Sequence, residues 1–309
     1  MKRDLCRGLG AALFLVALTA GASGAPRATS LVGGWQAELL EQIAVARRET
    51  PEAFSRLDAA TARAELLDAR KRGTLATVSP VFKELGPEAL WPMVERIAFP
   101  LEKDLRPVRD SAQLALTVGL MEAAGELRDA RLATLWKNIL EGADTRAPVL
   151  RAAAGALARL ETLEAAQTLI ALSRLGGPRG EAVQEKLGEC RRLVVARALA
   201  DALEARPAPE EARRLARALG DAGSAWAWKT SSVSARSEEG AVRRVAAEAL
   251  VRAYLHYTGD VRQALSNAVL RVDAPETPSL IDAVRLQVEE PRRAELEALA
   301  ERLRRNPLR

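Results

Sequence analysis

A segment rich in alanine and leucine recurs along this chain at nearly constant spacing. Residues 242–250 (VRRVAAEAL) form its clearest copy, and residues 108–116 (VRDSAQLAL) and 149–157 (VLRAAAGAL) follow the same template. Weaker copies begin at Arg179 and Glu211. A period of roughly 30 to 40 residues is typical of solenoids, in which a unit buries its apolar side only by stacking on its neighbours.

The composition predicts that these units are helical. Hydrophobic residues make up 48% of the 309 residues, but aromatic residues make up only 4%, and alanine and leucine dominate. Alanine, leucine, arginine and glutamate are strong helix formers, and runs of β-branched residues are nearly absent. We therefore expect an all-α fold.

Further helices are expected between the repeat copies. Their apolar residues recur at spacings of three and four, which is the pattern of one helix face. We expect each unit to be an antiparallel pair, with an inner alanine-rich helix carrying the repeat copy and an outer helix. The outer stripes are Leu132, Leu135, Trp136, Ile139 and Leu140; Val195, Ala198, Leu199 and Ala202; and Val261, Ala264, Leu265, Ala268 and Val269.

The repeat copies and the stretch Leu219-Gly220-Asp221-Ala222-Gly223 resemble HEAT repeats over roughly residues 86–288. This resemblance implies a right-handed α-solenoid of stacked antiparallel helix pairs, an armadillo-type superhelix that binds partners. Two copies depart from the family pattern, because Arg179 and Glu211 occupy the valine position. Residues 224–240 are a poor helix, so we expect one outer helix to be frayed or replaced by a loop there.

The expected domain organisation has four parts. Residues 1–22 are a signal peptide, residues 23–85 an N-terminal helical cap, residues 86–288 the HEAT-like repeats and residues 289–309 a C-terminal capping helix.

The N-terminus has the layout of a cleavable secretory signal. Lys2, Arg3 and Arg7 precede the apolar run of residues 9–20 (LGAALFLVALTA), and small residues up to Ala22 follow. An apolar run of about twelve residues is short for a bilayer span. We therefore expect a periplasmic or secreted protein, with an uncleaved membrane anchor as the alternative.

The charge pattern argues against a nucleic-acid partner. The 46 basic and 41 acidic residues give a formal charge of +5, and the two signs are interspersed along the expected helices. Nucleic-acid binding proteins usually gather basic residues into a patch or stripe. Interspersed charges instead indicate a solvated surface with ion pairs along helices.

No residue pattern indicates catalysis, a cofactor or a metal. His256 is the only histidine, so a zinc site or a cysteine–histidine pair lacks the necessary ligands. We expect it near a helix C-terminus, partly buried or capping. Arg191 and Arg192 could lower the pKa of Cys190, but a small packing residue is the simpler interpretation. The glycines of residues 176–180 lack the ending of a phosphate-binding loop and predict an inter-helix turn.

Trp226 and Trp228 are the candidate partner-binding residues. They are two positions apart, and such residues do not share a helix face. One ring is therefore expected to be exposed, where it could contact a protein or a glycan. The alternative is that both rings fill an irregular junction between repeats.

The sequence favours an exported, non-catalytic scaffold that binds a protein or peptide on the concave face of the solenoid. One alternative is binding of an envelope polymer, such as a glycan or peptidoglycan, through the tryptophans and scattered arginines. Another is a lyase or chaperone module, because some HEAT-like domains act on bilin cofactors. The partner's identity and the oligomeric state stay open.

Overall fold

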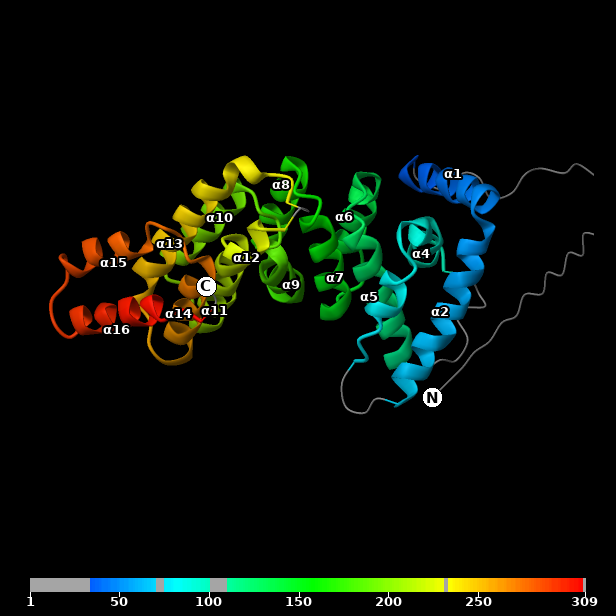
Figure 1. Cartoon of the computed structure of the whole chain (residues 1–309). Helices are drawn as coiled ribbons and strands as arrows, with labels where there is room; N and C mark the ends of the chain where they lie inside the picture. The colour runs from blue at the N-terminus through cyan, green and yellow to red at the C-terminus, as the bar shows by residue number, and fades with distance from the viewer. Residues whose placement is uncertain (1–33, 71–74, 101–109, 231–232, 308–309) are drawn as a thin grey trace, which may run out of the picture.

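The computed structural model describes residues 34–70, 75–100, 110–230 and 233–307, and these residues form helices and no strand (Figure 1). The all-α prediction is therefore confirmed. The expected signal peptide, and Val108 and Arg109 of the first repeat copy, lie outside the described residues. The α-helices are α1 Gly34–Glu49, α2 Pro51–Arg70, α3 Ser79–Lys83, α4 Leu90–Ala98, α5 Asp110–Glu126, α6 Ala133–Glu141, α7 Ala147–Ala158, α8 Leu163–Ser173, α9 Gly177–Leu187, α10 Leu193–Glu204, α11 Pro209–Ala222, α12 Ala225–Trp228, α13 Glu239–Tyr254, α14 Gly259–Val272, α15 Thr277–Arg285 and α16 Arg292–Arg304.

The helices form two rows along the length of the molecule, as Figure 1 shows. Successive helices of the lower row pack against each other, as do most of the upper row, and each helix also packs against a helix of the other row. We call the rows upper and lower from their places in the figure. The lower row is α2, α5, α7, α9, α11, α14 and α16, and the upper row is α1, α4, α6, α8, α10, α13 and α15.

Proline and polar caps start several of these helices where the sequence predicts. Pro51 and Pro209 are the first residues of α2 and α11, where a missing backbone N–H costs no helical hydrogen bond. Thr162 caps α8 by accepting a hydrogen bond from the N–H of Ala165 at 3.1 Å. The glycine-rich stretch behaves as expected: α9 begins at Gly177, and a Cβ on Gly180 would lie 1.7 Å from the carbonyl oxygen of Leu175.

Small residues set the distance between neighbouring helices of the lower row. A Cβ on Gly125 of α5 would lie 2.6 Å from the Cβ of Ala156 in α7. A Cβ on Gly188, the C-cap of α9, would lie 2.0 Å from the carbonyl oxygen of Ala218 in α11. Contacts this short leave no room for a larger side chain. The alanine-rich inner helices expected from the sequence are therefore closely packed in four of the five copies, on α5, α7, α9 and α11.

The prediction that the fifth repeat copy lies on the same side of the molecule as the other four is wrong. Residues 242–250 lie on α13, which packs against α10 and α15 of the upper row. The stripe from Val261 to Val269, expected on an outer helix, lies on α14, which packs against α11 in the lower row. The four-residue helix α12 and the loop after it connect α11 to α13, so no outer helix is lost. Alanine-rich faces occur in both rows, and the template cannot distinguish them.

Ala156 tests the close packing of α5 and α7, because its side chain is fully buried. Replacing it by aspartate would force a larger, charged side chain into a contact that has no room even for a Cβ on Gly125. We expect Ala156→Asp to lower the free energy of unfolding by about 3 kcal/mol or more in chemical denaturation. The control is Ala59→Asp, on the exposed side of α2, which should cost less than about 1 kcal/mol. Equal losses in the two variants would contradict the packing described.

Candidate functional site

A groove of about 670 Å³ lies near the N-terminal end of the molecule. We call it the apolar groove. Its floor is α5, through Leu116, Leu120 and Met121. Its lining is completed by Asp58, Thr61, Ala62 and Glu65 of α2, Arg96, Ile97 and Pro100 at α4, Gln113 and Thr117 of α5, Ile139 of α6, Gly142, Ala143, Asp144 and Arg146 before α7, and Val149 of α7.

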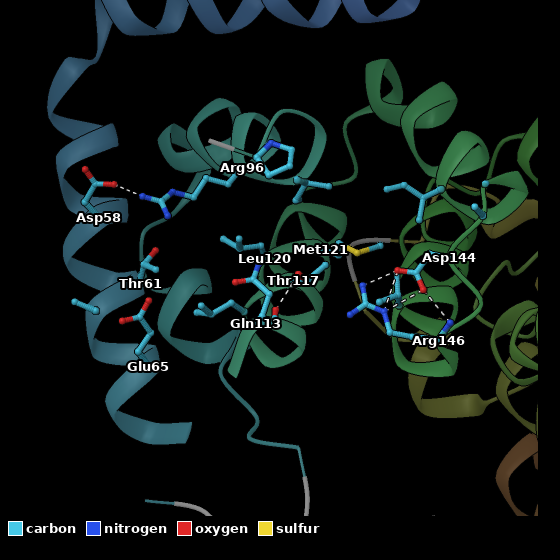
Figure 2. A pocket seen from close by; sticks show the side chains of 18 residues that line it. Asp58, Thr61, Glu65, Arg96, Gln113, Thr117, Leu120, Met121, Asp144 and Arg146 are labelled. Atoms are coloured by element: carbon cyan, nitrogen blue, oxygen red, sulfur yellow. Dashed lines mark hydrogen bonds and ion pairs between the residues drawn. The ribbon is translucent and has the colours of Figure 1, made fainter. Parts of the chain in front are cut away.

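The groove lies between two polar rims. Figure 2 shows Asp58, Thr61 and Glu65 on one side and Asp144 and Arg146 on the other, with the α5 side chains between them. Apolar residues in the middle and polar residues at the edges are the usual arrangement of a binding pocket, and the volume lies within the usual range for such pockets.

Ion pairs hold both rims in place. On one side, the guanidinium of Arg96 donates to the carboxylate of Asp58, which joins α4 to α2. On the other side, Arg146 donates to Asp144 through its backbone N–H at 2.9 Å and through its guanidinium Nη2 at 2.6 Å. These hydrogen bonds from Arg146 hold the pKa of the Asp144 carboxyl below its ordinary value. The rims therefore present fixed polar groups on either side of the apolar floor.

Two polar side chains of the lining have no hydrogen-bond partner among the described residues. They are the carboxylate of Glu65 and the amide of Gln113, and each side chain is partly exposed. The hydroxyls of Thr61 and Thr117 already donate to backbone carbonyls of their own helices, at 2.9 Å in each case. Glu65 and Gln113 are therefore the groups through which the groove can hydrogen-bond an occupant.

The two predicted contact tryptophans lie in different environments. Trp226 is 67% exposed, with the Lys229 ammonium 5.6 Å from its ring centre. Trp228 is 1% exposed, and its indole N–H donates to the carbonyl of Ala222 at 2.8 Å. Trp228 packs with Ala196, Val233 and Val242. Its ring fills the junction between α10, α11 and α13, so only Trp226 is placed where a partner could contact it.

Sequence reasoning did not single out Glu161, whose side chain is completely buried. The Arg191 guanidinium lies 3.4 Å and the Arg128 guanidinium 3.9 Å from its Oε1. The backbone N–H of Ser234 donates to its Oε2 at 2.6 Å. We call these four residues the Glu161 cluster. Both carboxylate oxygens are occupied, so the cluster binds the loop after α12 to the turns that follow α5, α7 and α9.

A second carboxylate strengthens this attachment. Glu238 accepts from the Arg192 guanidinium at 2.8 Å and from the backbone N–H of Leu193 at 2.5 Å. Arg192 also donates to the backbone carbonyl of Glu161 at 3.0 Å. The segment that carries Trp226 is thus attached at two points, by Glu161 to Ser234 and by Glu238 to the start of α10. No local pattern in the sequence predicts these long-range contacts.

The two candidate reactive residues differ in their surroundings. Cys190 is fully buried, and burial together with the nearby Glu161 carboxylate raises the pKa of its thiol to about 12, despite the two adjacent arginines. His256 follows α13 and is exposed. Partial burial and the positive charges of Arg206 and Arg292 lower its pKa. His256 therefore lies near a helix C-terminus, as expected, with an exposed side chain, and the packing interpretation of Cys190 is confirmed.

In the described part of the chain, no group of three or more histidine, cysteine, aspartate or glutamate side chains is arranged to hold a metal ion. Across the same residues, no helix combines the length and apolar composition needed to cross a bilayer. No protein-family model matches this chain, and no curated protein matches it at a significant level.

Glu161 should be important for stability because its replacement would remove the buried counter-charge of two partly buried arginines, Arg128 and Arg191. We expect Glu161→Gln to reduce the free energy of unfolding by about 3 kcal/mol in urea denaturation. The matched control is Glu185→Gln, because Glu185 is 40% exposed and pairs with Arg151 at 3.3 Å. That variant should lose less than about 1 kcal/mol. A loss for Glu161→Gln no larger than for the control would refute the structural role of the cluster.

The raised pKa of Cys190 predicts an unreactive thiol. In a Cys6→Ser variant, where Cys190 is the only thiol, we expect a disulfide reagent at pH 8 to react about a hundredfold more slowly with native than with denatured protein. The release of the reagent's chromophore measures the rate. Equal rates in the two states would show that Cys190 is accessible and ionised in the folded protein.

Proposed function

We propose that this chain is an exported, non-catalytic scaffold that binds an extended segment of a partner protein. The observation that carries the proposal is the apolar groove, with its floor of Leu116, Leu120 and Met121. A hollow with apolar residues in its middle and polar residues along its rims is the usual form of a binding pocket. A peptide suits the groove because it can place apolar side chains on α5 and polar groups against both rims.

We further propose that the two rows form a HEAT-like, right-handed α-solenoid whose concave face is the lower row. In support, helix-to-helix packing is continuous from α2 to α14 along the lower row in the described residues, and α16 packs only weakly against α14. Along the upper row it is interrupted on both sides of α6. Helices on the inner side of a curved stack lie closer together than those on its outer side, and repeat proteins use that inner side to bind.

The charge of the apolar groove indicates which peptides it would accept. Asp58, Glu65 and Asp144 face it with Arg96 and Arg146, so the carboxylates exceed the guanidiniums by one, and Glu65 is the unpaired one. Complementary charge steers partners and fixes their register. We therefore expect bound segments to combine apolar side chains with a lysine or arginine that reaches Glu65.

Selection from a random peptide library on the purified protein tests this proposal without the natural partner. We expect enriched peptides to contain apolar residues and a basic residue, and to bind in fluorescence anisotropy. Ala62→Glu places a larger, charged side chain in the groove from an exposed position, and should weaken binding about tenfold or more because it occupies the space in which the apolar side chains of the peptide would pack. The control is Ala59→Glu, an exposed residue of the same helix outside the groove, which should bind as the unmodified protein does.

Two results would count against the proposal. Peptides that bind Ala62→Glu and Ala59→Glu equally would place the binding surface elsewhere, with Trp226 the next residue to test. Failure to select any peptide, together with retention of the protein on insoluble peptidoglycan, would support the envelope-polymer alternative instead.

A further inference from the structure

A second groove, of about 360 Å³, lies between α11 and α14 in the C-terminal half of the molecule. We call it the arginine groove. Its lining residues are predominantly polar, in contrast to those of the apolar groove, and none of them is aromatic. They are Arg213, Arg217 and Asp221 of α11, and Asp260, Gln263, Ala264, Asn267, Ala268 and Arg271 of α14.

Close packing of two parallel helices creates this groove. A Cβ on Gly220 would lie 3.0 Å from the Cβ of Ala268, so α11 and α14 approach closely at that point. Arg213, Arg217 and Asp221 are spaced by four residues, so they form one ridge along α11. On α14, Ala264 and Ala268 are too small to fill the space beside that ridge. The groove is therefore a strip of small residues with guanidiniums along its edge.

The three arginines differ in how their charge is compensated. Arg271 pairs with Asp221, and Arg213 pairs with Glu210 on the same helix. Arg217 is exposed and has no hydrogen-bond or ion-pair partner in the part of the chain that the structure describes. Its neighbours across the groove, by the register of Gly220 with Ala268, are the alanines of α14. Arg217 therefore has its donors available for an external group.

A carboxylate is the group that this arrangement suits best. Guanidinium groups bind carboxylates through two parallel hydrogen bonds, and these charge-assisted bonds are stronger than neutral ones. Arg217 is the one guanidinium of the lining without a described ion pair, because Arg213 pairs with Glu210 and Arg271 pairs with Asp221. A sugar polymer is a poorer fit, because the lining offers no aromatic ring on which a sugar ring could pack.

We propose that the arginine groove binds an acidic segment of the same partner protein, with Arg217 holding one of its carboxylates. This inference rests on the proposed function. Helices of the lower row line both grooves, and the apolar groove carries the unpaired carboxylate of Glu65 whereas the arginine groove carries the unpaired guanidinium of Arg217. A partner that lies along the row is therefore held by apolar and basic residues at one end and by acidic residues at the other.

The test uses a fluorescein-labelled hexaglutamate peptide in anisotropy titrations at about 50 mM salt. Arg217→Glu should weaken binding about tenfold or more, because it replaces attraction by repulsion at an exposed site that does not support the fold. The matched control is Arg197→Glu, an exposed arginine of α10 in the upper row that also has no described partner. It should change the affinity less than about twofold.

Several outcomes would overturn the inference. Equal weakening by Arg217→Glu and Arg197→Glu would mean that the peptide responds only to overall charge. Binding of hexaglutamine as tight as that of hexaglutamate would remove the role of the carboxylates. Tighter binding of a hexagalacturonate, lost in Arg217→Glu, would assign the groove to an acidic glycan.

The proposed function and this inference can fail separately. Ala62→Glu should leave hexaglutamate binding unchanged, because Ala62 lines only the apolar groove. If Ala62→Glu weakens binding of the selected peptides while Arg217→Glu leaves hexaglutamate binding unchanged, the role of the apolar groove is supported and that of the arginine groove is refuted. The reverse result would retain the arginine groove and refute the apolar one.

Discussion

The close approach of neighbouring helices in the lower row is the interaction on which the rest of the structure depends. Gly125 meets Ala156 and Gly188 meets Ala218 at distances that leave no room for a Cβ, and Gly220 meets Ala268 at a distance tighter than most Cβ contacts. Single helix pairs of this kind cannot bury their apolar faces, so stability comes from the contact between successive units. The small residues are what make that contact possible, because they bring the helix backbones together and allow dispersion contacts along the whole row.

The same stacking produces both grooves. Where small residues line the side of a helix that its neighbour does not cover, the surface is left hollow, as at Ala62 of α2 in the apolar groove and at Ala264 of α14 in the arginine groove. The long side chains at the edges then decide the chemistry of each groove. In the apolar groove, both arginines are in ion pairs, and the carboxylate of Glu65 has no ion-pair partner in the described part of the chain. In the arginine groove, the guanidinium of Arg217 has no ion-pair partner among the described residues.

Buried charge and surface charge have different roles in this protein. The Glu161 carboxylate is saturated by Arg128, Arg191 and the Ser234 N–H, so it holds three turns and the loop after α12 together. Glu65 and Arg217 are unsaturated and partly or fully exposed, which is the condition for binding an external group. The same contrast separates the tryptophans. The ring of Trp228 is buried and its N–H donates to a backbone carbonyl, whereas Trp226 is largely exposed to solvent.

The sequence by itself determined that the described chain is all helical, where most helices begin, and that small residues bring neighbouring helices together, because propensity, proline position and apolar spacing act over a few residues. It also indicated that two tryptophans two positions apart face different ways. Only the tertiary structure decided that α13 belongs to the upper row and α14 to the lower, that Trp228 is the buried ring, and that Glu161 meets Ser234. It also decided the pKa of Cys190, which burial raises although two arginines follow in the chain. These features depend on residues brought together from distant units, and a repeat template contains no information about which neighbour a helix will contact.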